Sequence, residues 1–218
     1  MKHLAILLAF LALLGCSGQP LRPPVLTDAM YPWPLRPPTA LGTNFLWQQR
    51  LTARVGPRSD SLPVAVQKQG DTLTMIGLTP FNTKAFLLTQ TGDAIDFKKF
   101  VDRDLPFPPR YVLVDFQRTW LALGPSKLGP LPGAGTLPED GKEITGLDGE
   151  VLTQRVQGGK LVERQFVRLG TPGEANSPPL TIRYSGYRPD GLPGKVVLTN
   201  RWFGYELEIE TLAAQPLP

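Results

Sequence analysis

The sequence predicts a mainly β fold with few helices, in the α+β class. Apolar and polar residues alternate with a period of two along much of residues 45–212, which is the pattern of strands with one buried face. Short turns that contain glycine separate neighbouring segments, as is typical of antiparallel hairpins. Apolar side chains recur at helical spacing in one stretch, residues 111–123.

The first part of the predicted sheet is a run of neighbouring strands joined by tight turns. Phe45, Trp47 and Leu51 alternate with polar residues, and Gly70 and Gly92 lie in two later turns. Glycine adopts the left-handed backbone angles that such turns need. We therefore expect a meander of antiparallel strands over residues 45–55, 62–67, 72–78, 84–90 and 94–100.

One amphipathic helix is predicted after this meander. Val112, Phe116 and Trp120 lie at helical spacing in residues 111–123, although the β-branched residues there also allow a strand. Residues 124–149 are dominated by glycine and proline, so we expect a long surface loop.

Strands resume after the loop. A Gly-Gly turn at residues 158–159 joins the first two of them. In the last one, Tyr205, Leu207 and Ile209 alternate with glutamates, which predicts one buried and one solvated face. The five predicted strands cover residues 151–157, 161–169, 180–185, 195–202 and 205–212.

Residues 1–15 predict an export signal. Lys2 and His3 precede an apolar run over residues 4–14, which is too short to cross a bilayer and ends just before Cys16. The ending Leu-x-Gly-Cys resembles the lipobox of bacterial lipoproteins, and this resemblance implies that Cys16 is acylated and begins the mature chain. An ordinary cleaved signal that contains a cysteine is the alternative.

The resemblance to lipoproteins also bears on localisation and domain organisation. Ser17 follows the cysteine, and in that class serine permits export to the outer membrane, so we expect a lipid anchor on its periplasmic face. Residues 16–43 are rich in proline, which predicts an extended, semi-rigid tether. Residues 44–213 then form the folded domain.

Composition excludes several classes of function. Once the signal is removed, the chain has no histidine and no free thiol, because His3 leaves and Cys16 carries lipid. Hydrolases that depend on histidine or cysteine, zinc sites and disulfides are thereby excluded. The formal net charge of +4 has no basic block behind it, so we expect no nucleic-acid partner. No cofactor or metal motif occurs, and the acids of residues 139–150 lack the spacing of a calcium loop.

The turn at residues 77–83 carries an aromatic residue at its tip. Pro80 and Asn82 indicate a turn between two strands, and Phe81 lies between them. Turn chemistry alone favours a Phe81 side chain that folds back onto the core over one that projects into solvent.

Two stretches resemble the LolB branch of the LolA/LolB lipoprotein-carrier superfamily, and in particular a group of uncharacterised bacterial outer-membrane lipoproteins. Residues 78–83, Leu-Thr-Pro-Phe-Asn-Thr, resemble the projecting loop of that family. Residues 182–187, Ile-Arg-Tyr-Ser-Gly-Tyr, together with residues 193–199 and 205–209, resemble its closing strands. The resemblance implies an incomplete antiparallel β-barrel, with helices covering the open side and an apolar cavity inside.

The resemblance also implies roles for particular residues. Pro80 and Phe81 occupy the membrane-insertion loop, so projection of Phe81 becomes the favoured expectation. Phe81 replaces the leucine of the family, and the glycine that follows it there is missing. Acyl chains would bind inside the half-barrel, where each buried methylene contributes about 0.8 kcal/mol. Candidate ligand-binding residues are Trp47, Leu51, Leu73, Phe86, Phe97, Phe116 and Trp120.

The leading hypothesis is thus a non-enzymatic outer-membrane lipoprotein that binds or receives the acyl chains of a lipid or lipoprotein. The cargo is one partner, the membrane is another through the lipid anchor, and a periplasmic carrier protein is a third. The alternatives are an envelope scaffold that kept the fold without cargo, and an enzyme that uses carboxylates alone.

Overall fold

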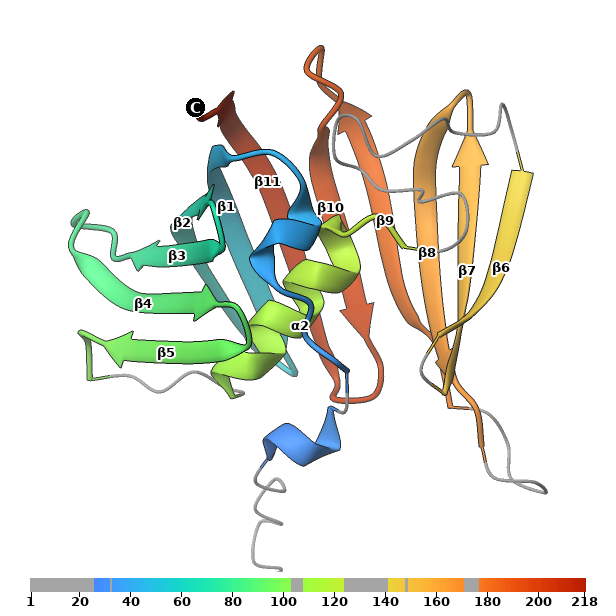
Figure 1. The fold of residues 1–218 in the computed structure, drawn as a ribbon. Helices are drawn as coiled ribbons and strands as arrows, with labels where there is room; N and C mark the ends of the chain where they lie inside the picture. Colours follow the sequence, from blue (N-terminus) through green and yellow to red (C-terminus); the bar gives the residue numbers. More distant parts are fainter. Residues whose placement is uncertain (1–25, 32, 103–107, 124–140, 148, 171–176) are drawn as a thin grey trace, which may run out of the picture.

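The computed structural model describes residues 26–31, 33–102, 108–123, 141–147, 149–170 and 177–218. Eleven strands form one antiparallel sheet in the order β5-β4-β3-β2-β1-β11-β10-β9-β8-β7-β6 (Figure 1). The two end strands, β5 and β6, do not pair with each other, so the sheet is open. The predicted mainly β fold, an incomplete barrel, is confirmed.

The bounds of the strands follow the predicted segments closely over most of the chain. The strands are β1 (Phe45–Val55), β2 (Arg58–Gln69), β3 (Thr72–Leu78), β4 (Lys84–Thr91), β5 (Ala94–Lys99), β6 (Gly141–Leu147), β7 (Glu150–Gln157), β8 (Lys160–Arg168), β9 (Leu180–Tyr187), β10 (Pro193–Asn200) and β11 (Tyr205–Pro216).

The sheet consists of two meanders that meet in its middle. The last strand, β11, pairs with the first, β1, from Phe45 opposite Pro216 to Val55 opposite Tyr205. Within the meanders, Gly70 and Gly92 have positive φ angles of 57° and 55°, as their turns require. The β1–β11 pairing places one meander on each side of the centre.

Strand β6 corrects the prediction of a loop over residues 124–149. Residues 141–147 pair with β7, with Gly141 opposite Val156. The segment escaped prediction because two of its seven residues are glycines and its Ile144 side chain is 62% exposed. An edge strand with so little burial has no apolar alternation to reveal it.

The α-helix of the described region, α2 (Pro109–Trp120), lies inside the curve of the sheet (Figure 1). Pro109 stands in its first turn, where the missing N–H costs nothing. The side chain of Gln117 bonds to Gln90 of β4, and that of Arg118 bonds to Glu150 of β7. Because β4 and β7 lie near opposite ends of the strand order, the sheet must bend around α2.

The segment before β1 corrects the prediction of a tether that begins at Cys16 and continues to residue 43. Its described part, residues 26–31 and 33–43, contains two 3-10 turns, η2 (Asp28–Met30) and η3 (Pro38–Leu41). Tyr31, Trp33 and Leu41 are buried in the core of the domain. Proline limits the regular structure there to short 3-10 turns but does not prevent these large side chains from packing.

Candidate ligand cavity

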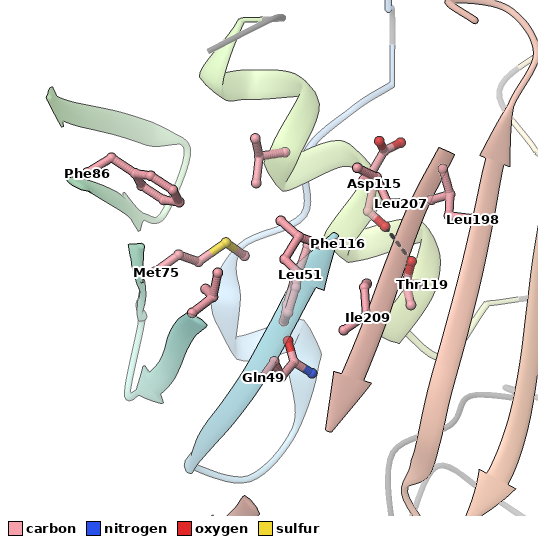
Figure 2. A pocket seen from close by; sticks show the side chains of 12 residues that line it. Gln49, Leu51, Met75, Phe86, Asp115, Phe116, Thr119, Leu198, Leu207 and Ile209 are labelled. Atoms are coloured by element: carbon pink, nitrogen blue, oxygen red, sulfur yellow. Dashed lines mark hydrogen bonds between the residues drawn. The ribbon is translucent and has the colours of Figure 1, made fainter. Parts of the chain in front are cut away.

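A small cavity lies between α2 and the concave face of the sheet (Figure 2). Its volume is about 50 Å³. Nine of its twelve lining residues are apolar, and the polar ones are Gln49, Asp115 and Thr119. We call this space the apolar cavity. Its lining is Gln49, Leu51, Val64, Met75, Phe86, Val112, Asp115, Phe116, Thr119, Leu198, Leu207 and Ile209.

Strand periodicity explains why the lining is apolar. Successive side chains of a strand point to opposite faces, so alternate residues of β1, β2, β3, β4 and β11 face α2. In β11, Leu207 and Ile209 face inward, while Glu208 and Glu210 face outward and pair with Lys195 and Arg50. The same alternation makes the outer face of the sheet charged.

The opposite side of α2 rests on a buried ion pair. Arg118 contacts Glu150 of β7, with Nη1 2.8 Å from Oε2 and Nη2 donating to Oε1 at 2.9 Å. Its guanidinium carbon lies 4.2 Å from the centre of the Trp33 ring and 4.6 Å from that of Phe166. A charge buried this deeply is tolerated because a counter-ion and aromatic faces replace water.

Asp115 occupies the middle of α2 and is fully buried. Its Oδ1 accepts a hydrogen bond from the Tyr31 hydroxyl at 2.6 Å, and its Oδ2 accepts one from the Tyr205 hydroxyl. Burial raises the pKa of Asp115 to about 6, although both tyrosines and the charge of Arg118 favour the carboxylate. The carboxyl group therefore titrates near neutral pH.

The C-terminal carbonyls of α2 are bonded by side chains from the sheet. Arg164 of β8 donates to the carbonyl of Arg118 at 2.8 Å and to that of Thr119 at 3.2 Å. The hydroxyl of Tyr184 in β9 donates to the Thr119 carbonyl at 3.0 Å. Helix ends leave such carbonyls without a partner inside the helix, so these contacts fix the position of this end.

The predicted ligand-binding residues divide into two groups. Leu51, Phe86 and Phe116 line the apolar cavity (Figure 2). The other four are packed elsewhere in the interior or at its margin and do not line it. They are Trp47, Leu73, Phe97 and Trp120.

Packing geometry explains the second group. Trp47 stacks on Phe45 with ring centres 3.9 Å apart and lies 4.8 Å from Trp120. Leu73 is fully buried, and Phe97 of β5 is half-buried with its ring centre 6.2 Å from that of Phe86. These residues fill the space between sheet and helix that the sequence analysis assigned to a ligand.

The loop between β3 and β4 presents Phe81 to solvent, with 88% of its surface exposed. Its conformation is fixed by Thr79, whose hydroxyl accepts hydrogen bonds from the backbone N–H groups of Phe81 and Thr83 at 3.2 and 3.3 Å. Asn82 has a φ angle of 58°. Projection of Phe81 is therefore confirmed, and Pro80 beside it is exposed as well.

Three expectations from the sequence concern lipidation, metal binding and membrane-spanning helices. Cys16 lies outside the described residues. Among the described residues, no group of three histidine, cysteine, aspartate or glutamate side chains is placed to hold a metal ion. In the same residues, no helix has both the length and the apolar character of a membrane span.

The polar residues of the site were not predicted from the sequence. The prediction of the helix named its apolar positions only, whereas Asp115, Gln117 and Arg118 of α2 are buried as well. Gln117 exchanges two hydrogen bonds of 2.8 Å with the backbone of Arg36. A signal for these buried residues is that polar side chains occur on every face of the helix, because a curved sheet encloses it.

A family model described as "Protein of unknown function (DUF3261)" matches residues 46–213. No curated protein matches the sequence.

Solved structures with a similar course of the chain include a LolA superfamily protein from Nitrosomonas europaea, which is 12% identical. The match covers 84% of this chain and 90% of that one, with a TM-score of 0.43. A domain described as outer membrane lipoprotein-sorting, from Vibrio parahaemolyticus, is 11% identical over 80% of this chain and 85% of its own, with a TM-score of 0.42. These similarities concern the course of the backbone alone. The fold described above is established from the strand order of this protein.

Proposed function

The chain belongs to the DUF3261 family of proteins of unknown function, and from this premise we propose that it binds an acyl chain of a lipid or lipoprotein. The acyl chain would enter between α2 and strands β1–β3, at the apolar cavity. The observation that carries the proposal is this cavity, whose lining is apolar for nine residues of twelve and lies on the concave side of an open sheet.

The described conformation is a closed state in this proposal. Sites for small molecules have volumes of about 300–1,000 Å³, whereas the apolar cavity has about 50 Å³. An acyl chain therefore has to displace the side chains of Val112 and Phe116, which α2 places in the cavity. Ten buried methylenes would contribute about 8 kcal/mol, which is comparable to the burial of three or four apolar side chains.

The contacts of α2 are distributed in a way that favours opening on the cavity side. Hydrogen bonds join the described residues of α2 to β4, β7, β8, β9 and β11, through Gln117, Arg118, the C-terminal carbonyls and Asp115. Toward β1, β2 and β3, α2 contributes apolar contacts such as that between Phe116 and Trp47. A hydrocarbon chain can replace apolar contacts without leaving a polar group unpaired.

The remaining parts of the proposal concern the membrane. Acylation of Cys16 would anchor the protein at the periplasmic face of the outer membrane. The exposed side chain of Phe81, on a loop fixed by hydrogen bonds, would insert into the lipid surface near it. The role proposed is that of a non-catalytic receptor, similar to the LolB branch, which takes its cargo from a periplasmic carrier protein.

A probe of the apolar cavity tests the proposal. The chain from Ser17 onward retains every described residue, so it can be purified without the signal and the lipid. The fluorescent compound N-phenyl-1-naphthylamine should bind it, and long-chain acyl esters should displace the compound. Ile209→Trp fills the cavity and should abolish binding, while Leu212→Trp, on an exposed residue of the same strand, should not.

Ile209→Phe, a smaller change, provides a second variant if the tryptophan prevents folding. Thermal unfolding followed by circular dichroism reports whether each variant is folded. Failure of the folded wild-type chain to bind the probe, together with the absence of co-purified lipid, would refute the proposal.

A second candidate function is a scaffold of the cell envelope that kept the fold without cargo. The filled interior favours it, because Tyr31, Trp33 and Trp120 are fully or almost fully buried in the space that a carrier would leave for its ligand. A stoichiometric protein partner that co-purifies with lipid-free protein, together with lack of probe binding, would support this function over the first.

A further inference from the structure

Gln49 of β1 places a hydrogen-bond donor without a partner in the lining of the apolar cavity. Gln49 is only 4% exposed, and its Nε2 atom has no hydrogen-bond partner. Gln49 and Asp115 lie at opposite ends of the lining in the view of Figure 2. A buried donor without a partner costs about 1–3 kcal/mol. The Gln49 donor therefore needs an explanation, and a ligand that occupies the neighbouring space and accepts its hydrogen bond provides one.

A second unpartnered group lies directly opposite. Thr211 of β11 pairs with Gln49 across the two strands, is 7% exposed, and its Oγ1 atom also lacks a partner. The register shifts at this point, because Gln48 pairs with Ala213 and leaves Leu212 unpaired as a β-bulge. Bulges redirect side chains at functional sites. Here the two residues beside the bulge both bury their side chains on the inner side of the sheet.

We propose that Gln49 and Thr211 recognise the neutral carbonyl of an acyl ester or amide whose hydrocarbon chain occupies the apolar cavity. This inference rests on the proposed function and assigns the polar end of the ligand. The Nε2–H of Gln49 donates to the carbonyl oxygen, and the Thr211 hydroxyl supplies a second donor. The acyl groups of phospholipids and of lipoproteins carry such carbonyls.

Charge distinguishes a neutral carbonyl from a fatty-acid carboxylate. The twelve lining residues include no lysine, arginine or histidine, and the one ionisable side chain among them is the acid Asp115. A buried carboxylate without a cation is much more costly than a buried carbonyl with a donor. The cavity is therefore matched to an ester or amide and selects against the free acid.

The test compares ligands that differ at their polar end. Methyl decanoate, undecane and decanoate compete with N-phenyl-1-naphthylamine for the chain from Ser17 onward. In Gln49→Leu, the affinity for methyl decanoate should fall about tenfold relative to that for undecane, which corresponds to the loss of one hydrogen bond. Thr211→Val, which keeps the shape of the side chain, should lower the same ratio about threefold.

Gln48→Leu is the matched control, because Gln48 is the preceding residue of β1 and faces solvent. It should leave the ratio unchanged. The ratio is the readout because Gln49→Leu also alters the stability of the closed state, and such a change affects both ligands equally.

Three results would overturn the inference. If the probe and undecane bind but Gln49→Leu leaves the ratio at the wild-type value, the Gln49 amide bonds to water and the proposed function survives alone. If decanoate binds more tightly than methyl decanoate, the preference for a neutral carbonyl is wrong. If none of the ligands competes and the probe does not bind, the proposed function and this inference fail together.

Discussion

Replacement of Asp115 by asparagine should remove a pH dependence from the stability of the protein. Burial raises the pKa of Asp115 to about 6 in the folded chain, from its usual 3.8. A folded pKa above the unfolded one means that the folded state prefers the protonated acid. The stabilisation is complete below pH 3.8 and is lost as the pH rises through 6.

The difference in pKa sets the size of the effect. Each pKa unit corresponds to 1.36 kcal/mol, so the whole shift amounts to about 3 kcal/mol, of which about half is lost between pH 5 and pH 8. Asparagine keeps the shape of the side chain and accepts the hydrogen bond from Tyr31, but it does not ionise. The variant should therefore gain about 1–2 kcal/mol relative to wild type over this interval.

Urea unfolding at pH 5, 6, 7 and 8 provides the measurement. The control is Asp96→Asn, because Asp96 is an exposed residue of β5 and its removal leaves the buried acid in place. Its free energy of unfolding should follow that of wild type across the interval. A constant difference between wild type and Asp115→Asn from pH 5 to pH 8 would refute the reasoning.

Three other predictions concern a hydrogen bond to α2, a closely packed glycine and the exposed loop. Tyr184→Phe should lower the free energy of unfolding by about 1 kcal/mol in urea, because it removes a buried hydrogen bond to the helix; an unchanged value would mean that another donor replaces the hydroxyl. Gly77→Ala should lower it by about 1–3 kcal/mol, because a Cβ atom there would overlap the Phe86 ring. Gly146→Ala, with open space around it, should cost far less in the same measurement. Phe81→Ala should change stability by less than about 0.5 kcal/mol but reduce sedimentation of the chain from Ser17 onward with lipid vesicles, and equal sedimentation would count against the insertion loop.

The strands of the sheet could be predicted because each carries its own signal. In β11, three apolar residues alternate with three glutamates, and the structure buries the former and pairs the latter with cations. The turns at Gly70 and Gly92 depend on local backbone angles, which no distant contact has to supply. Strand β6 had no such signal, because it is stabilised by pairing with β7 on one side.

The interior of the half-barrel could be predicted only in part. Its apolar lining on the side of β1–β4 follows from periodicity, and Leu51 and Phe86 were found in that way. The buried pairing of Arg118 with Glu150 joins residues 32 positions apart, so no local pattern shows it. The same holds for Tyr31, which is 84 positions from its partner Asp115 and lies in a segment whose prolines predicted a tether.

The sequence by itself determined the described strands other than β6, their turns, the amphipathic helix α2 and the apolar side of those strands, since these depend on residues close together in the chain. Only the tertiary structure decided what occupies the concave face. A sheet that curves around a helix removes water from all sides of it, so the polar residues of α2 had to find partners on distant strands. This enclosure leaves a small apolar cavity where a large one was expected. The lining of the cavity contains the Nε2–H donor of Gln49, which has no hydrogen-bond partner.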